Sequence, residues 1–203
     1  ENDGGLARSE PGQGVDIACF PELCLSGYSL DDRIKEVSGP VPGEATLRLE
    51  HIARLYGMVI IAGLPELTTR GNYLSQAVIT PERNEGSYRK IHLSPEEGAH
   101  FFPGKEAPLF DWRGFRFGLG LCYDAHFPEL ATTYALKGAD IIFYASASPR
   151  PETAEEKMNR WLRYLPARAY DNTVYVAACN QAGRSDSGMV FHGVSIILDP
   201  KGV

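Results

Sequence analysis

Short apolar runs alternate with stretches of helical pattern along most of the chain, and this alternation limits the possible folds more than any other feature. Strand-like runs lie at residues 15–20, 58–64, 73–80, 87–93, 115–121, 140–145, 174–178 and 189–198. Apolar residues at helical spacing occur at residues 44–56, 128–136 and 153–165. Strands interspersed with helices predict an α/β or layered α-β sandwich fold rather than an all-helical or all-β one.

The size and charge of the chain narrow its class. Its 203 residues, 43% of them hydrophobic, suffice for one α/β domain with a sizeable core, and we expect a single domain over residues 1–203. A net charge of -6 provides no cationic field for nucleic acid, which we do not expect as a partner. No apolar run approaches the roughly 20 residues that cross a bilayer, and the first residues lack a signal peptide's apolar region. We therefore expect a cytoplasmic protein without a membrane partner.

The cysteines and histidines do not follow a metal-binding pattern. The four cysteines are dispersed without a CxxC spacing, which favours free thiols over a zinc ribbon or a disulfide framework. The five histidines show neither HxH nor HExxH spacing. We expect no metal site.

Cys122 stands where the strand-like run at residues 115–121 gives way to a helical pattern. A thiol with a reference pKa of about 8.5 needs a base, a cation or a helix N-terminus to act as a nucleophile near neutral pH. A strand-to-helix junction directs backbone N–H groups at the sulfur and at an oxyanion beside it. The alternative is a small buried hydrophobe in a strand. We expect Pro128 in the first helical turn, with Asp124 or His126 capping its entry.

Two further residues have settings that suit acid–base chemistry. Glu22 comes just past the end of a predicted buried strand, where desolvation raises a carboxyl pKa. The same FPEL word recurs with Glu129, which instead falls in a first helical turn and complements the helix dipole. Lys90 lies within the predicted strand at residues 87–93. The alternatives are a turn residue for Glu22 and a solvated strand face for Lys90.

Three sequence motifs resemble those of the nitrilase, or carbon–nitrogen hydrolase, superfamily. They are FPE with Glu22, YRKIHL with Lys90 and GLGLCYD with Cys122, in this chain order. The resemblance runs from about residue 15 to the C-terminus and includes the words FPGK at 102–105 and PARAYDN at 166–172. It implies a four-layer α-β-β-α sandwich of the nitrilase type. It also implies a homodimer or higher homo-oligomer formed through the helices, a small-molecule amide substrate and no cofactor.

The resemblance also implies roles for these residues in a covalent acyl-enzyme reaction. Glu22 is expected to accept and return the proton, and Cys122 to attack the substrate carbon. Lys90 and the backbone N–H of Tyr123 are expected to stabilise the oxyanion. Many members place a second glutamate before a Pro-Gly pair, where it positions the substrate or the lysine. Glu97 is preferred over its neighbour Glu96 for this role, and the alternative is a pair of surface carboxylates.

The residues after the nucleophile narrow the reaction. Cys122-Tyr123-Asp124 resembles the amidase and carbamoylase branches, whereas true nitrilases have Trp-Glu there. His126 stands where many amidase-like members have arginine, which favours a structural role, and Ser148 lies in a loop expected near the substrate. We expect a hydrolase that cleaves a non-peptide C–N bond of a small amide or N-carbamoyl amine and releases ammonia. The alternatives are a nitrilase, a glutamine-hydrolysing amidotransferase component and a non-catalytic oligomerising member.

The ends of the chain depart from the family pattern. Members open with a strand and a helix before the FPE word, whereas residues 1–14 contain four glycines, a proline and no strand-like run. Members also continue beyond the point where this chain stops, at residues 200–203. A central strand missing from a sheet leaves backbone groups unpaired, which is costly. We therefore expect the chain to be incomplete at both ends.

Overall fold

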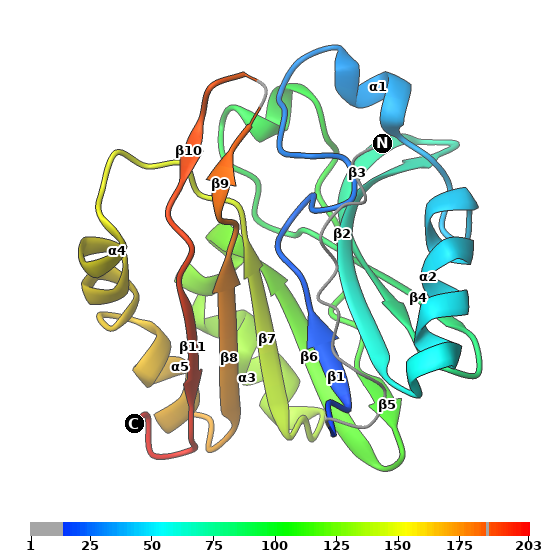
Figure 1. Cartoon of the computed structure of the whole chain (residues 1–203). Coiled ribbons are helices and arrows are strands. Elements are labelled where there is room, and N and C mark those ends of the chain that lie inside the picture. The colour runs from blue at the N-terminus through cyan, green and yellow to red at the C-terminus, as the bar shows by residue number, and fades with distance from the viewer. Residues whose placement is uncertain (1–13, 186) are drawn as a thin grey trace.

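Two β-sheets face each other in the computed structural model, which describes residues 14–185 and 187–203 (Figure 1). The first sheet has the order β1-β2-β3-β4. Its strands are β1 (Ile17–Cys19), β2 (Val59–Thr68), β3 (Gly71–Ile79) and β4 (Asn84–Arg89). β1 runs parallel to β2, and the other two pairs are antiparallel, so that β3 and β4 form the expected hairpin.

The second sheet has the order β11-β8-β7-β6-β5. Its strands are β5 (Phe110–Trp112), β6 (Phe115–Leu121), β7 (Ile141–Ser146), β8 (Tyr175–Asn180) and β11 (Ser195–Leu198). β6, β7 and β8 are parallel, whereas both outer pairs are antiparallel. Because the carboxyl ends of parallel strands meet at one edge of a sheet, the residues that follow β6, β7 and β8 lie together there. A separate pair joins β9 (Gly183–Arg184) to β10 (Val190–Phe191).

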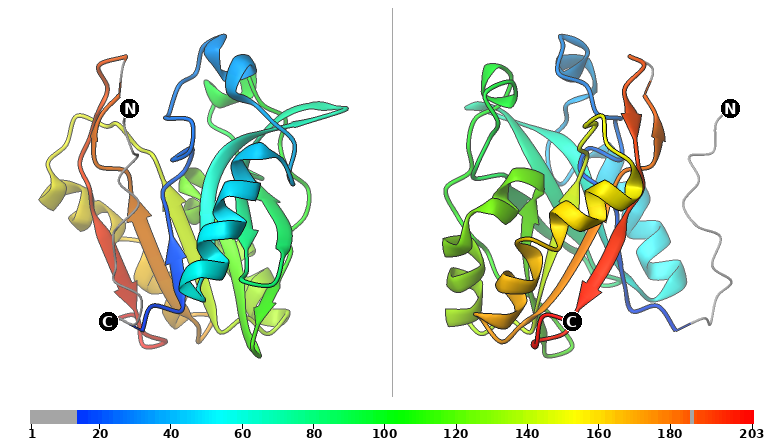
Figure 2. Two further views of the ribbon diagram at one scale, coloured as in Figure 1. Left: turned by 45° about the vertical axis from the view of Figure 1, so that its right-hand side comes forward. Right: turned by 90° about the vertical axis from the view of Figure 1, so that its left-hand side faces the viewer.

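Helices cover the outer faces of both sheets (Figure 2). α2 (Glu44–Tyr56) packs on the first sheet, where Leu49 and Ala53 meet Ile60 in a separate small core. α3 (Pro128–Leu136), α4 (Ala154–Trp161) and α5 (Leu165–Tyr170) lie on the side of the second sheet. Short helices α1 (Arg33–Val37), η1 (Glu97–Ala99) and η2 (Cys122–His126) sit in the connections. This arrangement confirms the expected mixed α/β class.

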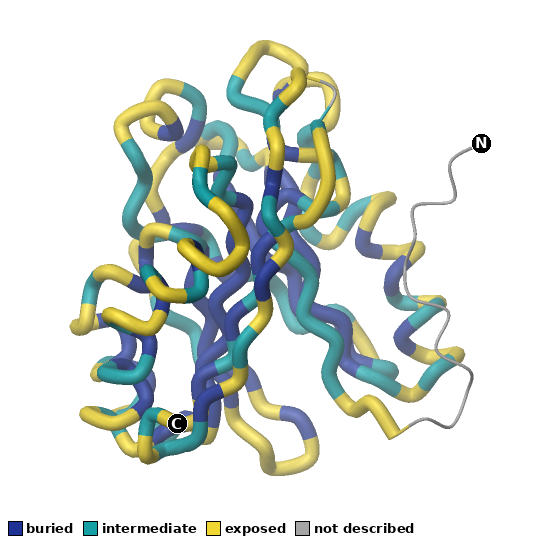
Figure 3. The backbone as a smooth tube through the Cα atoms, turned by 60° about the vertical axis from the view of Figure 1, so that its left-hand side comes forward, coloured by how far each residue is buried: buried dark blue, intermediate teal, exposed yellow. Residues whose placement is uncertain are grey.

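The main hydrophobic core lies between the two sheets. Leu74 and Val78 on β3 belong to the same buried cluster as Phe117 and Leu119 on β6. The burial pattern follows this layering, since the strands are mostly buried and the exposed residues gather on the helices and loops (Figure 3). Burial of apolar surface contributes about 25 cal/mol per Å². The contact between the sheets is therefore a principal source of stability.

Two glycines in β6 permit close aromatic packing. A Cβ added at Gly118 would lie 2.4 Å from a ring carbon of Tyr134, and one at Gly120 would lie 2.5 Å from a ring carbon of Tyr144. Both rings are fully or almost fully buried. The glycines that lead to Cys122 therefore mark a close approach of neighbouring side chains.

Several element boundaries differ from those expected. α2 and α3 have the expected bounds, but the helix expected at residues 153–165 divides into α4 and α5, with Pro166 in the first turn of α5. The run at 189–198 divides into β10 and β11. β4 ends at Arg89, the last residue in register with β3, so Lys90 follows the strand and does not lie within it, although its N–H still bonds to Leu74 O. The expectation for residues 1–13 lies outside the described residues.

The expected helix cap was also wrong. The N-cap of α3 is Phe127, and its side chain accepts no capping hydrogen bond. Asp124 and His126 lie in η2, before this cap. Pro128 does occupy the first turn of α3, as expected. The Asp124 carboxylate binds other groups, which are described below.

No helix within residues 14–185 and 187–203 is both long enough and apolar enough to cross a membrane.

Candidate active site

Four chain segments bring titratable side chains to the same end of the two sheets. Glu22 follows β1, Lys90 follows β4, and Glu97 opens η1. Cys122 follows β6 on the second sheet and opens η2. Glu22, Lys90 and Glu97 are 1%, 1% and 3% exposed. Buried charges of this kind require partners, because loss of hydration is costly.

Lys90 supplies the shared partner of the two buried carboxylates. Its Nζ donates to Glu22 Oε1 at 2.8 Å and to Glu97 Oε1 at 2.7 Å. The backbone N–H of Ala147, just past β7, donates to Glu22 Oε2 at 3.0 Å. The backbone N–H of Ser94 donates to Glu97 Oε2 at 2.8 Å. All four carboxylate oxygens are therefore held, and both glutamates have fixed orientations.

The environment places Glu22 where it can exchange a proton near neutral pH. Burial raises the pKa of Glu22 to about 7, although the charge of Lys90 opposes this rise. Burial also tends to lower the pKa of Lys90, but the charges of Glu22 and Cys122 outweigh it, and the pKa of Lys90 is raised. Lys90 is therefore an ammonium at neutral pH, whereas Glu22 is divided between its two forms.

Cys122 occupies a strained junction between β6 and η2. Its φ of 43° is in the left-handed region, which a non-glycine residue adopts at a cost of about 1–2 kcal/mol. Burial and the charge of Glu22 raise the pKa of its thiol, the charge of Lys90 opposes the rise, and together they place the pKa at about 11. The resting form is therefore the thiol, and a reaction through sulfur needs a base to take its proton.

Tyr28 belongs to this centre, although the sequence did not single it out. Its hydroxyl donates to Glu97 Oε1 at 3.2 Å, and its side chain is largely buried. Its pKa is raised, first by burial and then by the charges of Glu22 and Glu97. Tyr28 closes the FPELCLSGY word, but no spacing rule connects it with a glutamate 69 positions away. Only the fold brings the two together.

The loop after β7 is anchored on both sides of Ser148. The Ser148 backbone N–H donates to Asn180 Oδ1 at 3.0 Å, and its carbonyl accepts from Lys157 Nζ at 3.0 Å. Lys157 is fully buried and also pairs with Glu152 at 2.9 Å. Because Ala147 is in the same loop, these contacts also support its bond to Glu22. The sequence analysis assigned no role to Asn180, because no sequence motif includes it.

Tyr123 and His126 lie on the exposed side of η2. The His126 ring is 4.5 Å from the Tyr164 ring and 5.4 Å from the Tyr123 ring, measured between centroids. Partial loss of hydration lowers the pKa of His126, and the charges of Arg160 and nearby arginines add to this. A neutral imidazole packed between two aromatic rings agrees with a structural role for this residue.

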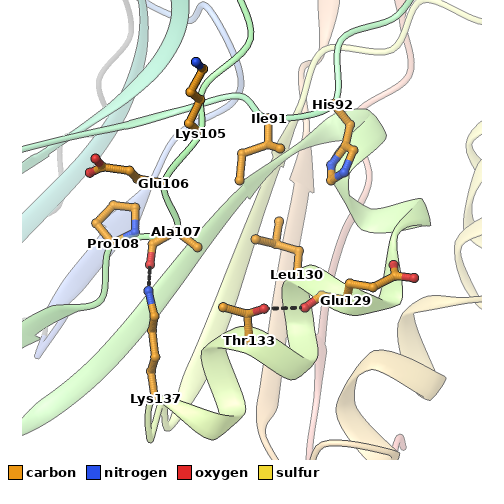
Figure 4. A pocket seen from close by; sticks show the side chains of 10 residues that line it. All are labelled: Ile91, His92, Lys105, Glu106, Ala107, Pro108, Glu129, Leu130, Thr133 and Lys137. Carbon is orange, nitrogen blue, oxygen red and sulfur yellow. Dashed lines mark hydrogen bonds between the residues drawn. The ribbon is translucent and has the colours of Figure 1, made fainter.

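Glu129 and Glu96 are set apart from the buried cluster. Both carboxylates are exposed, and Glu129 is on α3 at a cavity of about 560 Å³ (Figure 4). His92 and Lys137 also line this cavity, whereas Cys122 does not. The structure therefore separates the two FPEL words, since only the first contributes a buried carboxylate. Among the residues described, no group of three or more His, Cys, Asp or Glu has metal-binding geometry.

The chain is similar in sequence to proteins of a known family. The model of the carbon–nitrogen hydrolase family matches residues 6–203. The chain is 32% identical over 188 residues to an (R)-stereoselective amidase from Pseudomonas sp, covering 93% of this chain and 67% of the relative. It is 35% identical over 200 residues to a nitrilase from Pyrococcus abyssi, covering 97% of this chain and 73% of the relative.

Solved structures of an amidase from Nesterenkonia sp. AN1 have the same fold. One is a mutant in complex with butyramide, with a TM-score of 0.80, 30% identity and coverage of 94% of this chain and 72% of that chain. Another mutant shows the result of Michael addition of acrylamide at the active site cysteine, with a TM-score of 0.80 and 30% identity. It covers 94% of this chain and 74% of the other.

Proposed function

The chain belongs to the carbon–nitrogen hydrolase family, and on this basis we propose that it hydrolyses a small amide or N-carbamoyl amine through a covalent intermediate on Cys122. The observation that carries the proposal is the buried Lys90 ammonium, which joins two carboxylates beside a strained cysteine. Relatives with amidase names support an amide-type substrate.

The first half of the reaction forms an acyl-enzyme. Glu22 takes the thiol proton as Cys122 Sγ attacks the carbonyl carbon of the amide, because a carboxyl with a pKa of about 7 is an effective base at neutral pH. Lys90 and the backbone N–H of Tyr123 stabilise the oxyanion of the tetrahedral intermediate. Glu22 then gives its proton to the nitrogen, the C–N bond breaks, and ammonia leaves a thioester on Cys122.

The second half restores the enzyme. Glu22 removes a proton from water, whose oxygen attacks the thioester carbon, and the oxyanion is again stabilised by Lys90. Collapse of this intermediate breaks the C–S bond and releases the carboxylic acid. The proton held by Glu22 returns to the Cys122 sulfur, so that protons balance over the cycle.

Glu97 and Tyr28 hold Lys90 in place for both halves. Glu97 accepts from Lys90 Nζ at 2.7 Å, and Tyr28 donates to the same carboxylate oxygen. A lysine held by two acceptors has few alternative rotamers, so its remaining N–H is directed at the oxyanion without reorganisation. We assign Glu97 to positioning and not to proton transfer.

A nitrilase is the second candidate, because the Pyrococcus abyssi relative carries that name. Both reactions begin with attack by sulfur and end with a carboxylic acid and ammonia, and they differ in the substrate. Initial rates of ammonia release should therefore be measured with butyramide, butyronitrile, an N-carbamoyl amine and glutamine. The proposal predicts turnover of the amide or the carbamoyl compound. Exclusive turnover of the nitrile or of glutamine would contradict it.

Replacement of the nucleophile tests the mechanism directly. We expect Cys122→Ala to abolish turnover of every substrate, since no other group forms the thioester, and to retain the wild-type circular dichroism spectrum. Cys24→Ala is the matched control, because the pKa of Cys24 is raised to about 12 by burial and its thiol is unreactive at neutral pH. With a slow substrate, the acyl mass increase should map to the Cys122 peptide. Acylation of another cysteine, or undiminished turnover in Cys122→Ala, would overturn the assignment.

A further inference from the structure

A fully buried carboxylate two residues after Cys122 is not used by the mechanism above. Asp124 Oδ2 accepts from the Tyr88 hydroxyl at 2.7 Å and from the Leu121 backbone N–H at 2.9 Å. Asp124 Oδ1 is 2.8 Å from both the backbone nitrogen and the ring Nδ1 of His92. A carboxylate oxygen accepts hydrogen bonds, so in this contact the His92 ring is the donor, through Nδ1–H. One carboxylate thus receives four hydrogen bonds.

The four donors come from the two segments that carry the proposed reacting groups. Leu121 immediately precedes Cys122, whereas Tyr88 and His92 stand two residues before and two residues after Lys90. Asp124 therefore connects the cysteine junction to both sides of Lys90. We propose that Asp124 is a positioning residue: it fixes the position of Lys90 relative to Cys122. This inference rests on the proposed function.

The Asp124 contact holds the segment that follows Lys90. Before Lys90 the chain is fixed by the first sheet, and at Lys90 itself the backbone N–H donates to Leu74 O at 2.8 Å and the carbonyl accepts from the Gly104 N–H at 2.7 Å. Beyond Lys90 the chain leaves the sheet, and the two contacts of His92 with Asp124 attach it to η2. A displacement of about 1 Å in such a site lowers rates by about 10²-fold. The register between the two sheets is therefore a property that the reaction requires.

The His92 side chain is held in the orientation that donates to Asp124. Its ring stacks on Phe127 with a centroid distance of 3.6 Å and an interplanar angle of 5°. His92 also lines the cavity of Figure 4, together with Leu130 and Glu129 of α3. The His92 side chain therefore makes two separate contacts, a stacking contact with Phe127 and a hydrogen bond to Asp124, and each can be removed by a different substitution.

Two substitutions of His92 distinguish positioning from general support of the fold. His92→Phe keeps an aromatic ring on Phe127 and removes the donor, whereas His92→Asn keeps an N–H donor close to the position of Nδ1 and removes the ring. Positioning predicts that kcat falls about 10- to 100-fold in His92→Phe, with KM changed less than about 3-fold, and falls less than about 3-fold in His92→Asn. A purely structural role predicts that kcat follows thermal stability in both variants.

A pair of tyrosines provides a matched control. Tyr88 and Tyr134 are both fully buried, and each hydroxyl donates one hydrogen bond of 2.7 Å, to Asp124 Oδ2 and to Leu119 O respectively. Phenylalanine at either position removes one buried hydroxyl and keeps the ring. We expect Tyr88→Phe to lower kcat about 10-fold and Tyr134→Phe to keep the wild-type kcat, at similar losses of about 1–2 kcal/mol in stability.

Alkylation of Cys122 by iodoacetamide gives a readout that needs no substrate. Lys90 lowers the pKa of the Cys122 thiol, so loss of register reduces the thiolate that displaces iodide. We expect Asp124→Asn and His92→Phe to slow carbamidomethylation of the Cys122 peptide about 3- to 10-fold, and His92→Asn and Tyr134→Phe to leave it unchanged.

The outcomes separate this inference from the proposed function. If the wild type hydrolyses neither an amide nor a carbamoyl compound, the proposed function fails, and the alkylation rates still decide whether Asp124 positions Lys90. If Asp124→Asn does not fold, the His92 pair decides. Wild-type kcat and alkylation rates in folded Asp124→Asn and His92→Phe would overturn the positioning role. Equal losses in His92→Phe and His92→Asn that follow their melting temperatures would also overturn it.

Discussion

At the scale of single residues, the site depends on one ammonium shared by two buried carboxylates. The arrangement leaves one negative charge in excess when both carboxylates are ionised, and burial adds to the cost of that charge. The raised pKa of Glu22 relieves it, because Glu22 takes up a proton more readily than an exposed glutamate does. The same property makes Glu22 suitable as the base.

The pH profile should report this raised pKa. In the proposed mechanism Glu22 accepts the thiol proton only when it is ionised, so kcat/KM for a neutral amide should increase as the pH rises through about 7. An ordinary glutamate would place this acid limb near 4.5. Initial rates from pH 4 to 9 at constant ionic strength measure the limb, with an uncharged substrate to exclude its own titration. A midpoint below pH 5.5 would contradict the assignment.

Removal of the Lys90 ammonium should lower the rate of the reaction strongly, because the ammonium has two separate functions. Lys90→Met leaves Glu22 and Glu97 facing each other without a cation, and the proposed oxyanion loses one of its donors. We expect kcat/KM to fall about 10³-fold. Lys137→Met is the control, since Lys137 is exposed and donates to Ala107 O at the cavity of Figure 4. A Lys90→Met enzyme within 10-fold of wild type would show that the lysine does not act in the reaction.

At the scale of elements, β6 and η2 together present the cysteine. The strand brings Cys122 to the sheet edge, and the left-handed φ at its end turns the chain into η2. Tyr134 of α3 closes over Gly118 and donates to the Leu119 carbonyl at 2.7 Å. The helix therefore reaches the strand only because position 118 has no side chain.

This packing predicts the effect of a methyl group on β6. In Gly118→Ala the new Cβ would be 2.4 Å from the Tyr134 ring, and a buried ring has little room to move. We expect a loss of about 1–3 kcal/mol in the free energy of unfolding, measured with urea. Gly39→Ala is the control, because its Cβ would meet no atom within 4 Å, and it should change stability by less than about 0.5 kcal/mol. Equal stabilities of the two variants would contradict the tight packing.

At the scale of the whole molecule, the site depends on how the two sheets pack. Glu22 and Lys90 follow strands of the first sheet, whereas Cys122 and Ala147 follow strands of the second. The main core fixes the distance between these strand ends, because it contains buried side chains of both sheets. The same core that stabilises the fold therefore assembles the candidate active site.

A cavity in this core should be costly. Leu74 on β3 is fully buried between the sheets, and Leu74→Ala should lower the free energy of unfolding by about 2–5 kcal/mol. Leu47→Ala removes the same atoms from a side chain that is 59% exposed on α2, and should cost less than about 0.5 kcal/mol. Urea denaturation of both variants provides the comparison. Similar losses would show that the contact between the sheets is not the principal core.

Local patterns in the sequence were enough for the family, the mixed α/β class and most elements. The periodicity at residues 44–56 and 128–136 predicted α2 and α3 with their observed bounds, because an amphipathic stripe and the flanking glycine or proline are local signals. The three words around Glu22, Lys90 and Cys122 led to the family, which the match over residues 6–203 confirmed.

The partners of the polar side chains were decided only by the tertiary structure. Glu22 and Lys90 are 68 positions apart, and Tyr88 and Asp124 are 36 apart. Lys90 was assigned to a strand that ends one residue earlier, and Asp124 to a cap that it does not form. Local propensity describes how a segment folds, whereas a buried polar group is satisfied by whichever donors packing brings to it. The sequence therefore determined which groups were available for chemistry, and the packing of the two sheets determined which of them meet.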